Sequence, residues 1–194
     1  MKQPIFGDHI SIADFMSKTF FKITLVCILA AFVSPSFAQS RPDVEKKLTE
    51  LGITLAKMKA SNGNLLRAVR VGNLVYLSGH GPDKPGGGQI LGKVGDDLTV
   101  EQGKEAAKLC GIALLASLKH EIGDLNKVKR VVKVLGLVNS TPTLTQQPQV
   151  INGFTDFMVE VFGESGKHAR SAIGVASLPS GIAVEIEMIV EVAP

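Results

Sequence analysis

Three polar side chains stand at predicted strands, where side chains with chemical roles would be held rigidly. Arg170 precedes a predicted strand, and its planar guanidinium can hold a carboxylate through two parallel hydrogen bonds. Glu185 and Glu187 alternate with apolar residues in the last predicted strand, so both lie on one face of it. One of these carboxylates could act as a general acid or base, or hold a water molecule. The alternatives are a solvated arginine at a strand end and a solvated acidic face.

Residues 78–82, with the sequence SGHGP, form another candidate site at the end of a predicted strand. Gly79 lacks a side chain, so backbone N–H groups there can approach a ligand closely. His80 could move protons near neutral pH, although a single histidine in a turn more often makes only hydrogen bonds. The pattern of residues leaves both roles open.

Several common sites are not indicated by the sequence. His, Cys and carboxylate residues do not cluster at the spacing of metal ligands, so we predict neither a metal nor a cofactor. The three glycines at 86–88 are not followed by Lys and Ser or Thr, as a phosphate-binding loop requires. Aromatic residues make up 5% of the chain, and this scarcity argues against a surface that stacks nucleic-acid bases.

The first 38 residues have the pattern of a cleaved secretory signal peptide. Lys18 and Lys22 precede an apolar stretch at 23–33, which is too short to span a membrane, and the small residues around Ala38 suit a signal peptidase. Met16 is an alternative start of the chain, and an uncleaved anchor is the less favoured interpretation. We therefore expect an exported, periplasmic protein that is not attached to the membrane after cleavage.

The mature chain, residues 39–194, is expected to form one domain. Cleavage leaves 18 basic and 16 acidic residues of the 21 and 18 in the full chain, a net charge of +2. This near-neutral charge does not indicate a nucleic-acid partner. Cys110 is the only cysteine left after cleavage, so an intramolecular disulfide is excluded. Its apolar helical neighbours predict a buried, inert thiol.

Hydrophobic periodicity and turn residues predict strands and helices that alternate along the mature chain. We expect helices at 42–51, 99–122 and 147–162, and strands at 65–71, 74–78, 90–94, 128–138, 171–176 and 182–192. The first two strands and the last two strands are each expected to form a hairpin. The two longer helices have one apolar side each, which predicts an α+β fold with one mixed sheet and both helices on one face. The other sheet face still carries Val and Ile, so we expect an oligomer to cover it.

The residues themselves resemble the RidA (YjgF) family of imine deaminases, as a divergent, exported branch. The similar segments, which run in the family's order from about residue 48 to 192, are 71–79 (VGNLVYLSG), 129–138, Asn152, 168–171 (HARS), 178–179 (LP) and 184–187 (VEIE). The resemblance implies a chorismate-mutase-like fold. It also implies a homotrimeric barrel with sheets inside, helices outside and a site in each subunit interface.

In this family the enzymes hydrolyse 2-imino acids to 2-oxo acids and ammonia without a cofactor. The resemblance implies that Arg170 binds the substrate carboxylate and that Glu185 holds or activates the attacking water. Gly79 would supply backbone contacts, and Asn152 would line the pocket. Fixing a water molecule beside the imine carbon would remove part of the entropic barrier.

Three positions of the implied site depart from the family's pattern. Leu65 stands where the family has a tyrosine, Ala172 where it has a cysteine, and His80 where it commonly has a glutamine. Loss of the tyrosine hydroxyl affects catalysis more than it affects carboxylate binding by Arg170. The resemblance to the family makes an imine deaminase the main hypothesis. The alternative is a periplasmic protein that binds small carboxylates without catalysis, and a ribonuclease is disfavoured by the charge and the few aromatic residues.

Overall fold

The computed structural model describes residues 42–58 and 63–194. The expected signal peptide, including the alternative start at Met16 and the cleavage site after Ala38, lies outside these residues and stays a prediction. Within the described part, none of the helices combines the length and the apolar character that crossing a membrane requires.

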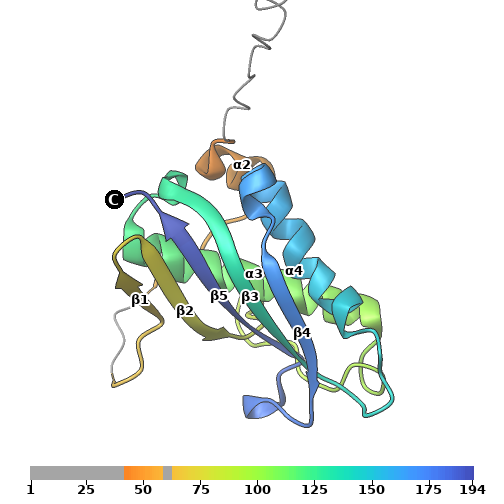
Figure 1. Ribbon diagram of the computed structural model, residues 1–194. Coiled ribbons are helices and arrows are strands. Elements are labelled where there is room, and N and C mark those ends of the chain that lie inside the picture. The colour runs from red at the N-terminus through yellow and green to blue at the C-terminus, as the bar shows by residue number, and fades with distance from the viewer. Residues whose placement is uncertain (1–41, 59–62) are drawn as a thin grey trace, which may run out of the picture. The chain divides into compact units, whose positions relative to one another are not determined.

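One five-stranded mixed sheet forms the centre of the fold, with the strand order β1-β2-β5-β3-β4 (Figure 1). The strands are β1 (Ala68–Val71), β2 (Leu74–His80), β3 (Val128–Asn139), β4 (Ala169–Val175) and β5 (Val184–Val192). Only β3 and β4 pair in parallel among these strands, and the other neighbours are antiparallel. The predicted α+β class with a mixed sheet is confirmed.

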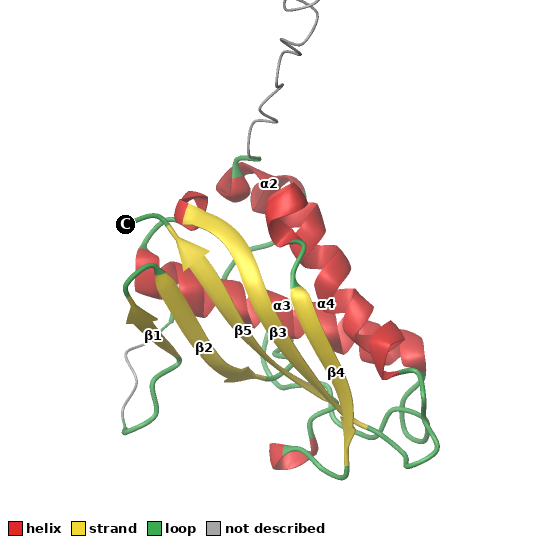
Figure 2. Cartoon of the chain, in the orientation of Figure 1, coloured by secondary structure: helices red, strands yellow, loops and turns green. Residues whose placement is uncertain are grey.

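Two long helices, α3 (Val100–Ile122) and α4 (Gln147–Phe162), pack against each other and cover one face of the sheet (Figure 2). The Thr99 side chain caps the start of α3 by accepting from the backbone of Gln102, whose side chain in turn accepts from the backbone of Thr99. This helix ends at Gly123, where φ is 81°. Both predicted helices and their placement on one sheet face are confirmed.

The two faces of the sheet differ in burial because side chains alternate along each strand. In β5, Val184, Ile186 and Met188 are buried beneath the helices, whereas Glu185 and Glu187 point to the other side. We call this second side the open face, since no described helix covers it. The alternation predicted for this strand is confirmed.

Apolar side chains remain exposed on the open face. The strand register aligns Val69, Tyr76, Ile189 and Lys133 in one row across four strands. Val69 and Tyr76 are each 44% exposed in the single chain. Such a surface favours burial against another molecule.

Two predicted elements are wrong. Residues 90–94 form no strand and make isolated bridges, from Leu91 to Ile182 and from Val94 to Leu98 and Ser140. The last two strands do not form a hairpin, because β3 lies between β4 and β5 and pairs with both. The helix α4 returns the chain to the end of the sheet at which β3 begins, so β4 runs parallel to β3. Strand β4 also begins earlier than expected, and Arg170 lies inside it rather than before it.

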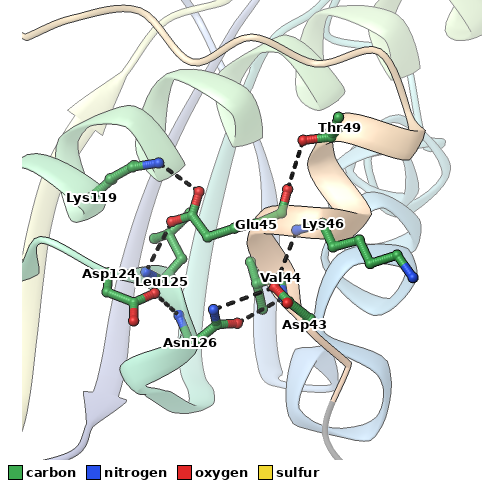
Figure 3. A network of polar contacts seen from close by, with 9 residues as sticks. All are labelled: Asp43, Val44, Glu45, Lys46, Thr49, Lys119, Asp124, Leu125 and Asn126. Atoms are coloured by element: carbon green, nitrogen blue, oxygen red, sulfur yellow. Dashed lines mark hydrogen bonds and ion pairs between the residues drawn. The ribbon is translucent and has the colours of Figure 1, made fainter.

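A short helix, α2 (Val44–Glu50), precedes the sheet and is held by a polar network (Figure 3). The Glu45 carboxylate binds the Lys119 ammonium of α3 at 2.5 Å and accepts from the backbone N–H of Leu125 at 3.4 Å. The Asn126 side-chain oxygen accepts from the backbone N–H of Val44 at 2.8 Å. These contacts fix α2 to the C-terminal end of α3 and to the following turn, and the predicted helix in this region is confirmed.

The close approach of α3 and α4 generates a prediction. A Cβ atom on Gly153 would overlap the backbone carbonyl of Lys104, which cannot rotate away as a side chain can. We expect Gly153→Ala to lower the free energy of unfolding by about 1–3 kcal/mol, because the helices must separate. Chemical denaturation measures this change. Gly63→Ala is the control, since nothing lies within 4 Å of its added Cβ, and an equal effect of both substitutions would contradict the prediction.

Candidate functional site

Arg170 is fixed against α4 by two hydrogen bonds from the same nitrogen. Its Nη1 donates to Oδ1 of Asn152 at 2.9 Å and to Oγ1 of Thr155 at 2.9 Å. Asn152 and Thr155 are three residues apart on α4, so their side chains lie on the same side of that helix. The structure therefore brings together Arg170 and Asn152, both expected at the site, and adds Thr155, which the sequence analysis did not single out.

The other edge of the Arg170 guanidinium, formed by Nε and Nη2, has no hydrogen-bond partner among the described residues. A guanidinium carries five N–H groups, and the two bonds from Nη1 use that nitrogen completely. Within residues 42–58 and 63–194, no acceptor is bound to Nε or Nη2. These two nitrogens form the pair of parallel donors that matches a carboxylate. Arg170 as a whole is half-buried.

Glu185 lies on the open face beside Gly79 of β2. The register of β2 against β5 shifts between Leu77 and His80, which brings the glycine next to the carboxylate. A Cβ atom on Gly79 would overlap Oε1 of Glu185, so the absence of a side chain leaves the space that the carboxylate fills. Burial, with the negative charge of Glu187, raises the pKa of Glu185 above its ordinary value. A carboxyl group with a raised pKa exchanges protons more readily near neutral pH.

Arg170 and Glu185 lie on opposite faces of the sheet. Arg170 pairs with Val134, whose side chain is buried beneath the helices. Glu185 pairs with Leu137 on the open face. Neighbouring residues in a ladder share a face, so the guanidinium lies on the helix side of edge strand β4. A single chain thus holds two separate groups, Arg170 with Asn152 and Glu185 with Gly79.

His80 joins the sheet to α3. Its Nδ1 lies 2.7 Å from the carbonyl oxygen of Ser78, which can only accept, so Nδ1 carries the hydrogen. Nε2 therefore accepts from the Ser117 hydroxyl at 2.6 Å. Burial lowers the pKa of His80, which favours this neutral form. The side chain is 4% exposed and also borders a cavity of about 140 Å³ with Arg67 and Asp83.

The other positions named from the family pattern occupy different surroundings. Leu65 precedes β1 and is 72% exposed. Ala172 is half-buried in β4 and packs against the core. Burial raises the pKa of the Cys110 thiol well above its ordinary value, and Sγ donates to the carbonyl of Val184 at 3.5 Å. The thiol is buried, as its helical neighbours predicted, and the raised pKa disfavours the reactive thiolate.

Two cavities show where small molecules could lie on the single chain. One of about 310 Å³ lies on the open face, where it is bordered by Tyr76, Ser78, Lys133 and Glu187. Lys133 donates to the Ser171 hydroxyl at 3.0 Å across the top of β3 and β4. A larger cavity of about 730 Å³ between residues 53–58 and α3 contains none of the expected site residues. Among the described side chains, no group of three or more His, Cys, Asp or Glu is placed to hold a metal ion.

The pKa of Glu185 can be tested by removing its negative neighbour. We expect Glu187→Gln to lower the pKa of Glu185 toward the ordinary value, because a like charge is lost while burial stays. A titration of the glutamate carboxyl carbons by NMR measures this pKa. Glu191→Gln, on the same strand face, is the control and should leave the pKa nearly unchanged. An unchanged value in Glu187→Gln would show that the neighbouring charge has no influence.

Comparison with known proteins gives relatives that cover most of the chain. This chain is 42% identical over 149 residues to Protein TCP17 of Trypanosoma cruzi, and the match covers 76% of this chain and 93% of the relative. It is 30% identical over 142 residues to the 2-iminobutanoate/2-iminopropanoate deaminase of Mus musculus, across 73% of this chain and 91% of that enzyme.

The solved structures agree with the sequence relatives. The protein Atu1372 of Agrobacterium tumefaciens, whose function is described as unknown, has a TM-score of 0.72 at 41% identity, across 78% of this chain and 94% of its own. The family model described as YjgF/chorismate mutase-like matches residues 45–190. The sheet, its two covering helices and these matches show that the chain belongs to the YjgF/chorismate mutase-like family, as its first hairpin and C-terminal residues predicted.

Proposed function

We propose that this protein hydrolyses 2-imino acids to 2-oxo acids and ammonia at a site formed between copies of the chain. The observation that carries the proposal is the free Nε and Nη2 edge of Arg170, held in place by Asn152 and Thr155. That edge matches the carboxylate that every 2-imino acid carries next to its C=N carbon. The similarity to the mouse 2-iminobutanoate/2-iminopropanoate deaminase supports the same substrate class.

The Glu185 carboxylate suits the chemical step. Water adds to the C=N carbon and passes a proton to Glu185, which returns it to the nitrogen of the tetrahedral intermediate. Glu185 next carries the hydroxyl proton to the same nitrogen, the C–N bond breaks, and ammonia leaves with the electron pair of that bond as the C=O bond forms. A raised pKa makes Glu185 a better proton acceptor and donor at the pH of the reaction. Gly79 leaves the room for this carboxylate beside the sheet.

The placement of the two groups supports a site shared by two copies. Arg170 lies on the helix side of an edge strand, whereas Glu185 lies on the open face, so a second chain must supply one of them. The exposed Val69, Val71, Tyr76 and Ile173 of the open face would be buried by the same contact. Two different surfaces that meet in this way form a ring when the rotation between copies closes, and we propose a closed homotrimer, the assembly that the resemblance to the family implies.

Leu65 favours a second candidate function, a binding protein for small carboxylates without catalysis. The family's tyrosine hydroxyl is absent at this position, whereas the carboxylate-binding edge of Arg170 is complete. A protein of this kind would bind the carboxylate through Arg170 but would not accelerate the loss of imine in the assay below.

The proposed reaction can be measured with imines made from amino acids by an oxidase. Semicarbazide traps the imine that remains, so faster hydrolysis reduces the trapped product. We expect the protein to accelerate the loss of 2-iminopropionate and 2-iminobutyrate. Arg170→Ala and Glu185→Gln should each lower this rate by about 100-fold, the effect of losing a charge-assisted contact or a proton carrier. Lys46→Ala, at a lysine of α2 whose side chain is 74% exposed, is the control. Equal rates with and without protein would exclude the deaminase.

Mixing the two inactive variants tests whether the site is shared. If Arg170 and Glu185 act from different copies, co-expressed Arg170→Ala and Glu185→Gln chains form some sites with both wild-type residues. About a quarter of the sites, and of the activity, should return. No recovery would contradict a shared site, provided that native mass spectrometry, which resolves the mass lost in Arg170→Ala, shows mixed trimers.

We also propose that the protein acts outside the cytoplasm, because its first 38 residues have the pattern of a secretory signal peptide. Expression of the full chain in a Gram-negative host should place it in the periplasm with Gln39 as its first residue. Mass spectrometry of the purified protein gives this terminus. A cytoplasmic protein that still begins at Met1 or Met16 would contradict export.

A further inference from the structure

His168 and Thr155 extend the contacts of Arg170 into a chain of hydrogen bonds. The Arg170 Nη1 donates to the Thr155 hydroxyl, and that hydroxyl lies 3.2 Å from Nε2 of His168. Nδ1 of His168 lies 2.6 Å from the carbonyl oxygen of Gly166. The chain therefore runs from β4 through α4 to the turn that connects them.

Each link of this chain has one possible direction. A carbonyl oxygen only accepts, so Nδ1 of His168 carries the hydrogen and Nε2 accepts. The Thr155 hydrogen must then be donated to Nε2, which leaves the Thr155 oxygen to accept from Arg170. Donors and acceptors aligned in this way strengthen one another.

The imidazole is held in this neutral state by its surroundings. Its ring packs edge-on against buried Phe154, with centroids 5.7 Å apart. Burial lowers the pKa of His168, the Gly166 carbonyl partly counteracts this, and the positive charge of Arg170 lowers the pKa further. A neutral imidazole with hydrogen on Nδ1 can accept from Thr155, whereas the imidazolium cannot.

We propose that Thr155 and His168 are positioning residues that turn the Nε and Nη2 edge of Arg170 toward the ligand carboxylate. This inference rests on the proposed function. Asn152 alone would leave one N–H of Nη1 unbound, and the guanidinium could then rotate to share other donors. With Thr155 oriented by His168, both hydrogens of Nη1 are bound inside the protein, and the parallel donors on Nε and Nη2 have no acceptor among the described residues. The His168–Thr155 pair thus sets affinity for a carboxylate without touching it.

Two matched pairs of variants separate the hydrogen bonds from the shape of the side chains. Thr155→Val removes the hydroxyl at nearly the same volume, and Thr155→Ser keeps it. In His168→Asn the amide can still donate to the Gly166 carbonyl but does not reach Thr155. In His168→Gln the longer amide places an acceptor near the position of Nε2.

The first readout is the dissociation constant of 2-oxobutanoate, a product of the proposed reaction, measured by calorimetry on the intact assembly. We expect Thr155→Val and His168→Asn to weaken binding about tenfold, the effect of one lost hydrogen bond to a charged group. Thr155→Ser and His168→Gln should stay within about twofold of the wild type. Equal weakening in both members of a pair, or none in either, would overturn the proposal.

The second readout needs no ligand. The ¹⁵N chemical shifts of His168 should show hydrogen on Nδ1 in the wild type, and a crystal structure of Thr155→Val should show a rotated Arg170 guanidinium. Hydrogen on Nε2, or an unmoved guanidinium, would overturn the proposal. If wild-type protein binds no 2-oxo acid and Arg170→Ala changes nothing, the proposed function fails, while this readout still decides whether the pair orients Arg170.

Discussion

The two-residue period of β5 is the constraint on which the rest of the structure depends. Val184, Ile186 and Met188 turn one side of the strand into the core, so the intervening Glu185 and Glu187 must point away from the helices. β5 is also the strand between β2 and β3, and its register sets which residues of both neighbours share each face. A slip by one residue would bury the carboxylates and expose the core. Stability and the position of Glu185 therefore have the same cause.

Close packing by glycines gives Arg170 its partners. Gly153 lets the backbone of α4 approach α3, and Gly136 leaves room on β3 for the Ile151 side chain of α4. The helix α4 consequently packs close to β3 and β4. Asn152 and Thr155 can therefore accept hydrogen bonds from Arg170 of the edge strand β4. A bulkier residue at either glycine would lift the helix and lengthen these bonds. The arrangement of Arg170 thus depends on residues that carry no polar group at all.

Much of the fold could be predicted because it follows from local patterns. The capping pair of Thr99 and Gln102 and the apolar side of each helix predicted both long helices. The alternation of apolar and acidic residues predicted the two faces of β5. The predicted hairpin of β4 and β5 was wrong. The turn residues between these two strands do not reveal that β3 lies between them in the sheet. Arg170 and Glu185 were candidates from their positions at predicted strands, and the resemblance to the family gave them roles and added Asn152. Thr155 was not predicted, and His168 was noted only as part of the similar segment 168–171, because the role of both depends on a contact between a helix and the turn after it.

Each half of the proposed shared site is already ordered within a single chain, Arg170 on the helix side of β4 and Glu185 on the open face. Arg170 is already bound by Asn152 and Thr155 within its own chain, and Glu185 already fills the space beside Gly79. If two copies meet at the proposed interface, they join two ordered halves and need not order either of them. The entropy of fixing these side chains is then lost on folding, before any substrate arrives. Assembly brings the two halves together, and a carboxylate that binds to Arg170 meets an oriented partner. On this argument, the polar contacts inside each subunit matter to affinity as much as the contacts between subunits.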